Sequence, residues 1–95
     1  MTATPPIVTV VHAPGCHFCE DAERVLTELA HQVPLDVRLV PSTSVAGLQL
    51  VAAHRPAMFP LVLVDGAFFS AGRLSHRRLR AVLTSRAGAP AAAVG

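Results

Sequence analysis

The two cysteines of this chain, Cys16 and Cys19, lie two residues apart and shortly after a run of β-branched residues. That run, Ile7–Val11, is continuously apolar, as in a strand that is covered on both faces. From Cys16 onward the apolar residues recur with helical spacing, as one stripe that ends before Pro34. A cysteine pair that follows a buried strand and opens a helix constrains the fold more than any other feature of the sequence.

Two further segments predict another strand and another helix. Residues 35–39 alternate apolar and polar side chains with period two, which is typical of a half-exposed strand. After a loop that begins at Pro41, Ser42 or Ser44 could cap a short helix that continues to about Ala53.

The following segment predicts a β-hairpin. Residues 61–64 and 67–69 are apolar and flank Asp65 and Gly66, a pair that suits the positive φ angles of a tight turn. A last amphipathic helix is expected after Gly72. The order is therefore β-α-β-α-β-β-α, which predicts an α/β fold with a four-stranded mixed sheet flanked by helices.

Length and composition predict one domain. The chain has 95 residues, of which 52% are hydrophobic, so it contains the material for a single core. We expect residues 1–6 to be a flexible lead and residues 7–87 to be the folded domain. Residues 88–95 carry no charged side chain and are expected to be a disordered tail.

The sequence also bears on where the protein acts. No apolar run approaches the ~20 residues of a membrane span, and the first residues lack the features of a signal peptide. We therefore expect a cytoplasmic protein without a membrane partner. Because the cytoplasm is reducing, a lone pair of closely spaced cysteines is expected to be catalytic or metal-binding rather than structural.

The positive charge is carried by arginine alone. The formal net charge is +2, and Arg77, Arg78 and Arg80 cluster in the predicted last helix. Such a cluster could bind nucleic acid, but no aromatic residues interleave with it, and the same residues fit the exposed face of an amphipathic helix. We expect no nucleic-acid partner.

The position of each cysteine suggests a division of labour in disulfide exchange. Cys16 would lie at a helix N-terminus, where unpaired N–H groups and the helix dipole favour the nucleophilic thiolate. Cys19 would lie one turn later on the buried stripe and remain a thiol until it resolves a mixed disulfide on Cys16. The pair is therefore interpreted as a redox couple.

Cys16 and Cys19 have two alternative roles besides a redox couple. A zinc or iron–sulfur module needs two more ligands, and His12 is near enough in sequence to Cys16 and Cys19 to be a third. Metal binding, possible in a dimer, thus stays as the alternative, although no metal is expected. A purely structural disulfide is disfavoured, because it would close a very small loop and be reduced in the cytoplasm.

The residues between the cysteines have two interpretations each. The imidazolium of His17 could stabilise the Cys16 thiolate and make the disulfide more oxidising, or the ring could be solvated beside the site. Phe18 could contact substrates or cover Cys19.

The sequence resembles the glutaredoxin-like branch of the thioredoxin superfamily. The segment GCHFCEDAERVLTEL is similar to the active-site helix of bacterial glutaredoxin-like proteins that carry C-H-x-C followed by acidic residues. The segment FPLVLVDGAFFSAGRLSHRRLRAVL resembles the C-terminal half of that branch, and the likeness covers residues 7–83. It implies a thioredoxin/glutaredoxin-like fold and a thiol–disulfide oxidoreductase, with Cys16 as nucleophile and Cys19 as resolving cysteine.

The resemblance also implies the surroundings of the pair. The Phe59–Pro60 peptide bond would be cis and lie against the cysteines, with the backbone of Phe59 free to pair with an extended substrate. Arg73 could supply a positive charge for the carboxylates of a small thiol, or be a solvated residue at the start of a helix.

The implied partners are redox partners. The substrate would be a disulfide-containing protein or a small thiol, and no cofactor would be bound. Electrons would come from a low-molecular-weight thiol, either glutathione or mycothiol, or from a flavoprotein reductase. The expected oligomeric state is a monomer.

Overall fold

The computed structural model describes residues 4–94, and the side chains of residues 4–86. The predicted element order is confirmed. The elements are β1 (Ile7–His12), α1 (His17–Ala30), β2 (Asp36–Pro41), α2 (Val45–His54), β3 (Leu61–Val64), β4 (Ala67–Ala71) and α3 (His76–Val94). Their bounds differ from the expected ones by a few residues, because caps and strand ends depend on tertiary contacts.

The expected domain boundaries stay predictions. Part of the lead, residues 1–3, lies outside the described residues, while Pro6 is buried and its carbonyl accepts a hydrogen bond from the Asp36 amide at 2.9 Å. At the other end the backbone of α3 continues to Val94. The side chains of the expected tail, residues 88–95, lie outside the described part of the chain.

The four strands form one mixed sheet in the order β2-β1-β3-β4. β1 pairs with β2 in parallel, as the intervening α1 requires, and β3 pairs with β1 and β4 in antiparallel fashion. β1 and β3 are thus the central strands, which explains why all of β3 and the three valines of β1 are buried. The predicted α/β fold with a four-stranded mixed sheet is confirmed.

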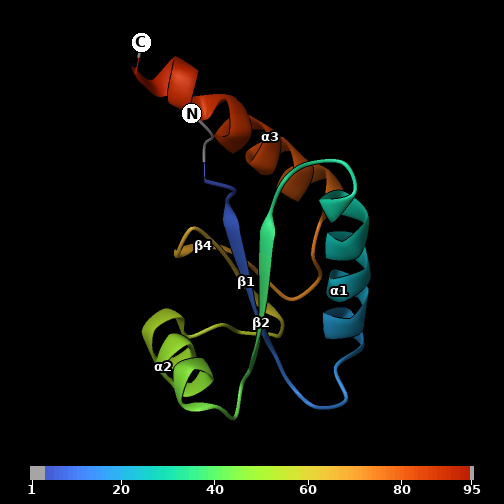
Figure 1. Ribbon diagram of the computed structural model, residues 1–95. Coiled ribbons are helices and arrows are strands. Elements are labelled where there is room, and N and C mark those ends of the chain that lie inside the picture. Colours follow the sequence, from blue (N-terminus) through green and yellow to red (C-terminus); the bar gives the residue numbers. More distant parts are fainter. Residues whose placement is uncertain (1–3, 95) are drawn as a thin grey trace.

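α1 and α3 cover one face of the sheet (Figure 1). α1 has its apolar stripe on the buried side, and Leu79 and Leu83 of α3 pack beside it. The main core consists of the buried residues Val8, Val10, Ala22, Leu26, Leu29, Val62, Val64, Leu74, Leu79 and Leu83.

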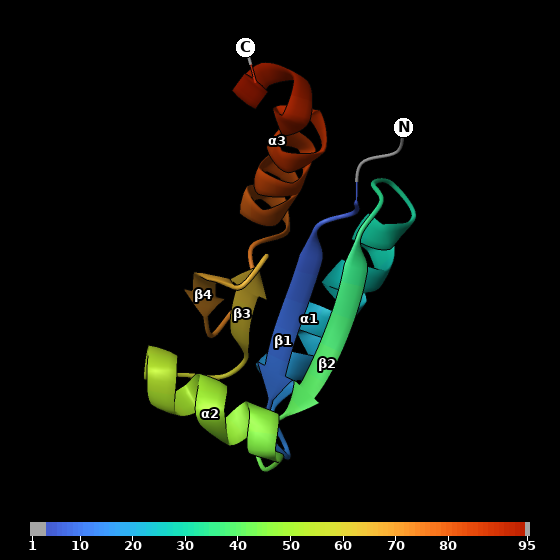
Figure 2. The same ribbon diagram turned by 60° about the vertical axis from the view of Figure 1, so that its left-hand side comes forward.

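α2 lies by the opposite face, at the end of the sheet where β1 and β2 finish (Figure 2). A smaller cluster lies here, in which Val11, Leu61 and Leu63 are buried and the half-buried Leu50 and Val51 of α2 pack against them. None of the helices in the described part of the chain is long and apolar enough to cross a membrane.

The hairpin turn between β3 and β4 also joins distant parts of the chain. Asp65 and Gly66 have φ angles of +51° and +85°, as the Asp-Gly pair predicted. The Asp65 carboxylate accepts a hydrogen bond from the Ile7 amide at 2.9 Å and forms an ion pair with Arg86. The turn therefore holds the start of β1 and α3 together.

Candidate functional site

The loop after β1 delivers Cys16 to the first position before α1. Gly15 has a φ of +65°, the left-handed conformation in which glycine is favoured, and nothing lies close to where its Cβ would be. Cys16 is the N-cap of α1, with extended backbone angles, and its Sγ accepts a hydrogen bond from the Cys19 amide at 3.1 Å. The Cys16 sulfur thus receives one of the unpaired N–H groups of the helix N-terminus.

The two cysteines are joined to each other in a disulfide. Cys16 is half-buried, whereas Cys19 is only 3% exposed and belongs to the inward-facing stripe of α1. An incoming thiol or thiolate can therefore approach Cys16 more easily than Cys19. This asymmetry is the one that disulfide exchange requires of an attacking and a resolving cysteine.

The side chains next to the cysteines differ in exposure. His17 is exposed in the first turn of α1, and Phe18 is 40% exposed, so Phe18 leaves much of its ring open to solvent. Asp21 forms an ion pair with Arg24 on the same helix, and Glu20 is exposed in the first turn. The acidic side chains therefore lie at the helix start, where they interact favourably with its dipole.

The segment before β3 lies at the same end of the sheet as the cysteine loop. The Phe59–Pro60 peptide bond is cis. Val11 pairs with Leu61 in antiparallel register, so Pro60 lies beside the end of β1, from which the cysteine loop departs. Pro60 is buried, and the half-buried Phe59 side chain packs against the smaller cluster rather than standing free.

Arg73 reaches this region from the loop before α3. Its neighbour Gly72 donates a backbone hydrogen bond to the Pro60 carbonyl at 3.0 Å. The exposed Arg73 lines a hollow together with Asp21 of α1 and His76 of α3. The structure therefore brings the Pro60 and Arg73 segments and the first turns of α1 to one end of the molecule.

Met58 is a candidate site residue that sequence reasoning missed. It is 50% exposed, and its Sδ would lie 3.3 Å from a Cβ placed on Gly72. Gly72 has a φ of +94°, a conformation that favours glycine, and a Cβ at this position would crowd the Met58 side chain. The sequence marks Met58 only by its position two residues before Pro60.

The possible third metal ligand, His12, is half-buried at the end of β1. Among the residues that the structure describes, no three His, Cys, Asp or Glu side chains are grouped as a metal site requires. Metal binding through Cys16 and Cys19 would therefore need ligands in addition to those that the described part of one chain brings together.

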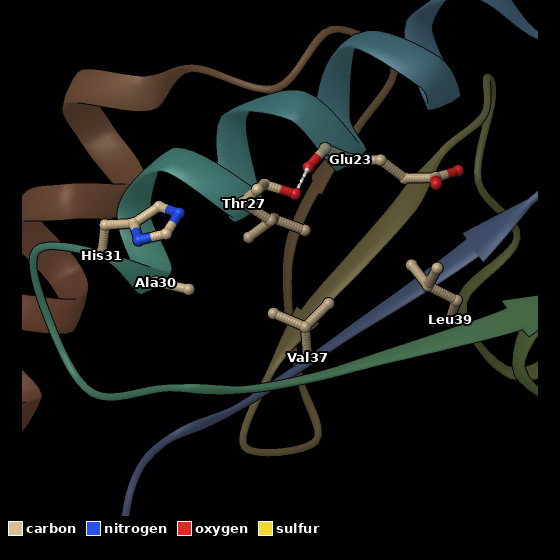
Figure 3. A pocket seen from close by; sticks show the side chains of 7 residues that line it. Glu23, Thr27, Ala30, His31, Val37 and Leu39 are labelled. Carbon is tan, nitrogen blue, oxygen red and sulfur yellow. Dashed lines mark hydrogen bonds between the residues drawn. The ribbon is translucent and has the colours of Figure 1, made fainter.

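A separate hollow lies away from the cysteines, between α1 and β2 (Figure 3). It has a volume of about 320 Å³. Val37 of β2 points toward Thr27 of α1 across it, and Leu39 lies on the side of Glu23. Its lining is mostly apolar, and no residue of the cysteine site contributes to it.

Comparison with known proteins identifies the fold. No protein-family model matches this sequence, and no curated protein matches it either. Among solved structures, an uncharacterised thioredoxin-like protein from Clostridium perfringens matches with a TM-score of 0.71 and 11% identity, over 84% of this chain and 69% of that one.

Two further structures agree. A mutant thioredoxin from Halobacterium salinarum matches with a TM-score of 0.68 and 20% identity, over 86% of this chain and 74% of that one. Trxlp from Edwardsiella tarda matches with a TM-score of 0.57 and 24% identity, over 86% of this chain and 84% of that one. The chain has a thioredoxin-like fold, and it carries a disulfide-forming C-x-x-C pair.

Proposed function

We propose that this protein is a thiol–disulfide oxidoreductase of the glutaredoxin-like type, which acts in the cytoplasm. The proposal rests on one observation above all: Cys16 and Cys19 form a disulfide at the N-terminus of α1, with Cys16 the more exposed partner. The thioredoxin-like fold supports it, because this fold presents the same cysteine spacing at the same helix end in proteins that exchange disulfides.

The reaction consists of two thiol–disulfide exchanges. In the reduced protein, the Cys16 thiolate attacks one sulfur of a substrate disulfide, forms a mixed disulfide and releases the other substrate sulfur as a thiolate. Cys19 loses its proton and attacks the Cys16 sulfur, which releases the second substrate thiolate and forms the Cys16–Cys19 disulfide. Two electrons pass to the substrate, whose two thiolates then take up protons.

Two thiols or a reductase must return the protein to its dithiol form. Two molecules of glutathione or mycothiol can do so by the reverse sequence of exchanges, in which the pair is reduced and a small-molecule disulfide forms. A flavoprotein reductase is the other donor class. If the donor is glutathione, Arg73 is proposed to bind one of its carboxylates, because Arg73 is exposed in the hollow beside α1.

The remaining residues are proposed to shape the substrate site. His17 stabilises the Cys16 thiolate, and Phe18 offers an apolar contact to the substrate. The backbone of Phe59, next to the cis Pro60, pairs with an extended substrate segment. Phe59 lies outside the strands and helices, and no backbone carbonyl of the described residues accepts a hydrogen bond from its amide.

The decisive experiment measures reduction of a model disulfide by the purified protein and its two cysteine variants. Cys16→Ser should abolish the activity, whereas Cys19→Ser should keep Cys16 reactive and accumulate a mixed disulfide that mass spectrometry detects. Gln49→Ala, at an exposed position of α2 away from both cysteines, is the control and should keep full activity. Activity that survives Cys16→Ser, or alkylation that favours Cys19 over Cys16, would contradict the proposal.

A redox titration places the pair among known couples. The two cysteines should change together at a midpoint between about −270 and −200 mV, the range from thioredoxin to glutaredoxins. Arg73→Ala should raise the KM for glutathione and leave turnover with dithiothreitol unchanged. A metal that must be removed before the cysteines react would instead support the metal-binding alternative.

A further inference from the structure

The outer edge of β2 is unpaired among the described residues. β2 ends the sheet, and among the described residues its one strand neighbour is β1. The Asp36 amide donates to the Pro6 carbonyl at 2.9 Å, and the Ser42 amide donates to the His12 carbonyl at 2.8 Å. Even-numbered residues of this segment therefore bond to β1, and the N–H and C=O groups of Val37 and Leu39 point away from the sheet.

The sequence along this edge complements itself in the antiparallel direction. Leu35-Asp36-Val37-Arg38-Leu39 has an apolar residue at its centre, an acidic and a basic residue on either side, and leucine at both ends. If two copies pair about Val37, each Asp36 lies opposite Arg38 of the other copy, and each Leu35 lies opposite Leu39. Opposite charges directly across two strands stabilise the pair.

The hydrogen-bond pattern selects the same register. If two copies pair about Val37, the hydrogen-bonded pairs are Val37–Val37 and Leu35–Leu39. These are the residues whose backbone N–H and C=O groups point away from β1. Asp36 and Arg38 then form non-hydrogen-bonded pairs, in which side chains of the two strands approach most closely. In the single chain, Arg38 and Asp36 form an exposed ion pair at 3.1 Å along one strand, so both charges already lie on the same face of the sheet.

Neighbouring registers lack this agreement. Pairing about Arg38 places two arginines opposite each other, and pairing about Asp36 does the same with two aspartates, both of which are destabilising. Pairing about Leu39 places Val37 opposite Pro41, which has no N–H to donate. Among these four registers, only the one centred on Val37 satisfies both the charges and the backbone.

We propose that this protein forms a homodimer in which the β2 strands of two copies pair in antiparallel fashion about Val37. The two sheets become one continuous sheet, and both α1 helices lie on the same face of it. Leu39, which is 47% exposed in the single chain, is covered by Leu35 of the second copy. Val37 and Leu39, which pair across the interface, also line the hollow between α1 and β2 (Figure 3).

The dimer leaves both cysteine sites accessible. Cys16 follows the carboxyl end of β1, which runs parallel to β2, so antiparallel pairing of β2 places the two disulfides toward opposite ends of the interface. The proposed dimer differs from the monomer expected from the sequence, and the experiment below decides between them. It does not depend on the redox function, because none of the interface residues belongs to the cysteine site.

Charge exchange across the interface gives a test with its own rescue. Sedimentation velocity over a concentration series should show the 9.9 kDa wild-type chain approaching twice that mass. Asp36→Arg and Arg38→Asp should each shift the protein to the monomer mass, because each reversal creates two like-charged contacts by symmetry. The double variant D36R/R38D restores both opposite-charge contacts and should restore the dimer.

Two further variants complete the test. Val37→Pro removes an outward-pointing N–H without removing a hydrogen bond to β1. Circular dichroism should show that this variant is folded, and sedimentation velocity should show that it is a monomer. Arg24→Asp breaks a comparable exposed ion pair on α1 and should leave the dimer unchanged. A wild-type chain that is monomeric at every concentration overturns the proposal. If the β2 edge instead binds an extended segment of another protein, the wild-type chain alone stays monomeric, and the proposal is overturned in the same way. A dimer that neither single reversal dissociates overturns it as well.

Discussion

The two faces of the sheet carry hydrophobic cores of different size. On the face covered by α1 and α3, ten buried residues from two helices, two strands and the loop before α3 form a continuous core. On the other face, three buried residues form a small cluster, and α2 contributes only the half-buried Leu50 and Val51 to it. α2 also leaves Val45 and Leu48 mostly exposed, at 74% and 60%.

The difference indicates which parts of the molecule hold the cysteines in place. α1, which carries Cys16 and Cys19 at its start, is anchored in the larger core by Ala22 and Leu29. The cis Pro60 segment is anchored by Phe59 in the smaller cluster. The two halves of the candidate site therefore rest on opposite faces, and the smaller face is the weaker support.

The largest expected effect comes from removing a leucine from each face. Leu79→Ala should lower the free energy of unfolding by about 3–5 kcal/mol, since Leu79 is fully buried between helices that cannot easily close the cavity. Leu63→Ala, on the other face, should cost about 2–3 kcal/mol, because α2 can move into the space. Chemical denaturation measures both, and equal losses would remove the distinction between the faces.

Gly47→Ala tests the contact that seats α2. A Cβ on Gly47 would overlap the Pro41 carbonyl oxygen and lie 2.9 Å from the Ser42 Cα, so α2 must move away from the end of β2. We expect a loss of about 1–3 kcal/mol in the free energy of unfolding and faster amide exchange in α2. Gln49→Ala, at an exposed position of the same helix, should leave both quantities nearly unchanged.

The smallest effect should come from the helix caps. The Ser75 hydroxyl accepts from the Arg78 amide at 3.2 Å, and the Ser44 hydroxyl accepts from the Gly47 amide at 3.0 Å. Ser75→Ala should lower global stability by about 1 kcal/mol. Ser44→Ala should lower it by about 0.5 kcal/mol and act mainly on amide exchange in α2. A larger global loss for Ser44→Ala would show that α2 unfolds only with the whole domain.

Local patterns were enough to predict the elements of this fold. The β-branched run, the helical stripe after Cys16 and the Asp-Gly turn each depend on residues that are close in sequence, and all three are confirmed. The local sequence offers both Ser42 and Ser44 as the cap of α2, and the structure assigns it to Ser44. The choice depends on where β2 ends, which local sequence does not determine.

Long-range placement was beyond the sequence patterns. Nothing in the local sequence indicates that Met58 lies against Gly72, or that the Phe59 ring turns into the smaller cluster. Both follow from the return of β3 alongside β1, which brings together segments that are far apart in the chain. The alternation of residues 35–39 predicted a strand, but its position at the sheet edge became visible only with the strand order.

The carboxylate of Asp65 has a practical consequence for handling this protein. It holds Ile7 and Arg86 at one pole of the molecule, whereas Cys16 follows the other end of β1, about 20 Å away. A fusion partner or surface tether joined near either of these residues would therefore leave the disulfide facing outward. The protein could be immobilised on a resin or an electrode from that pole without hindering access to Cys16.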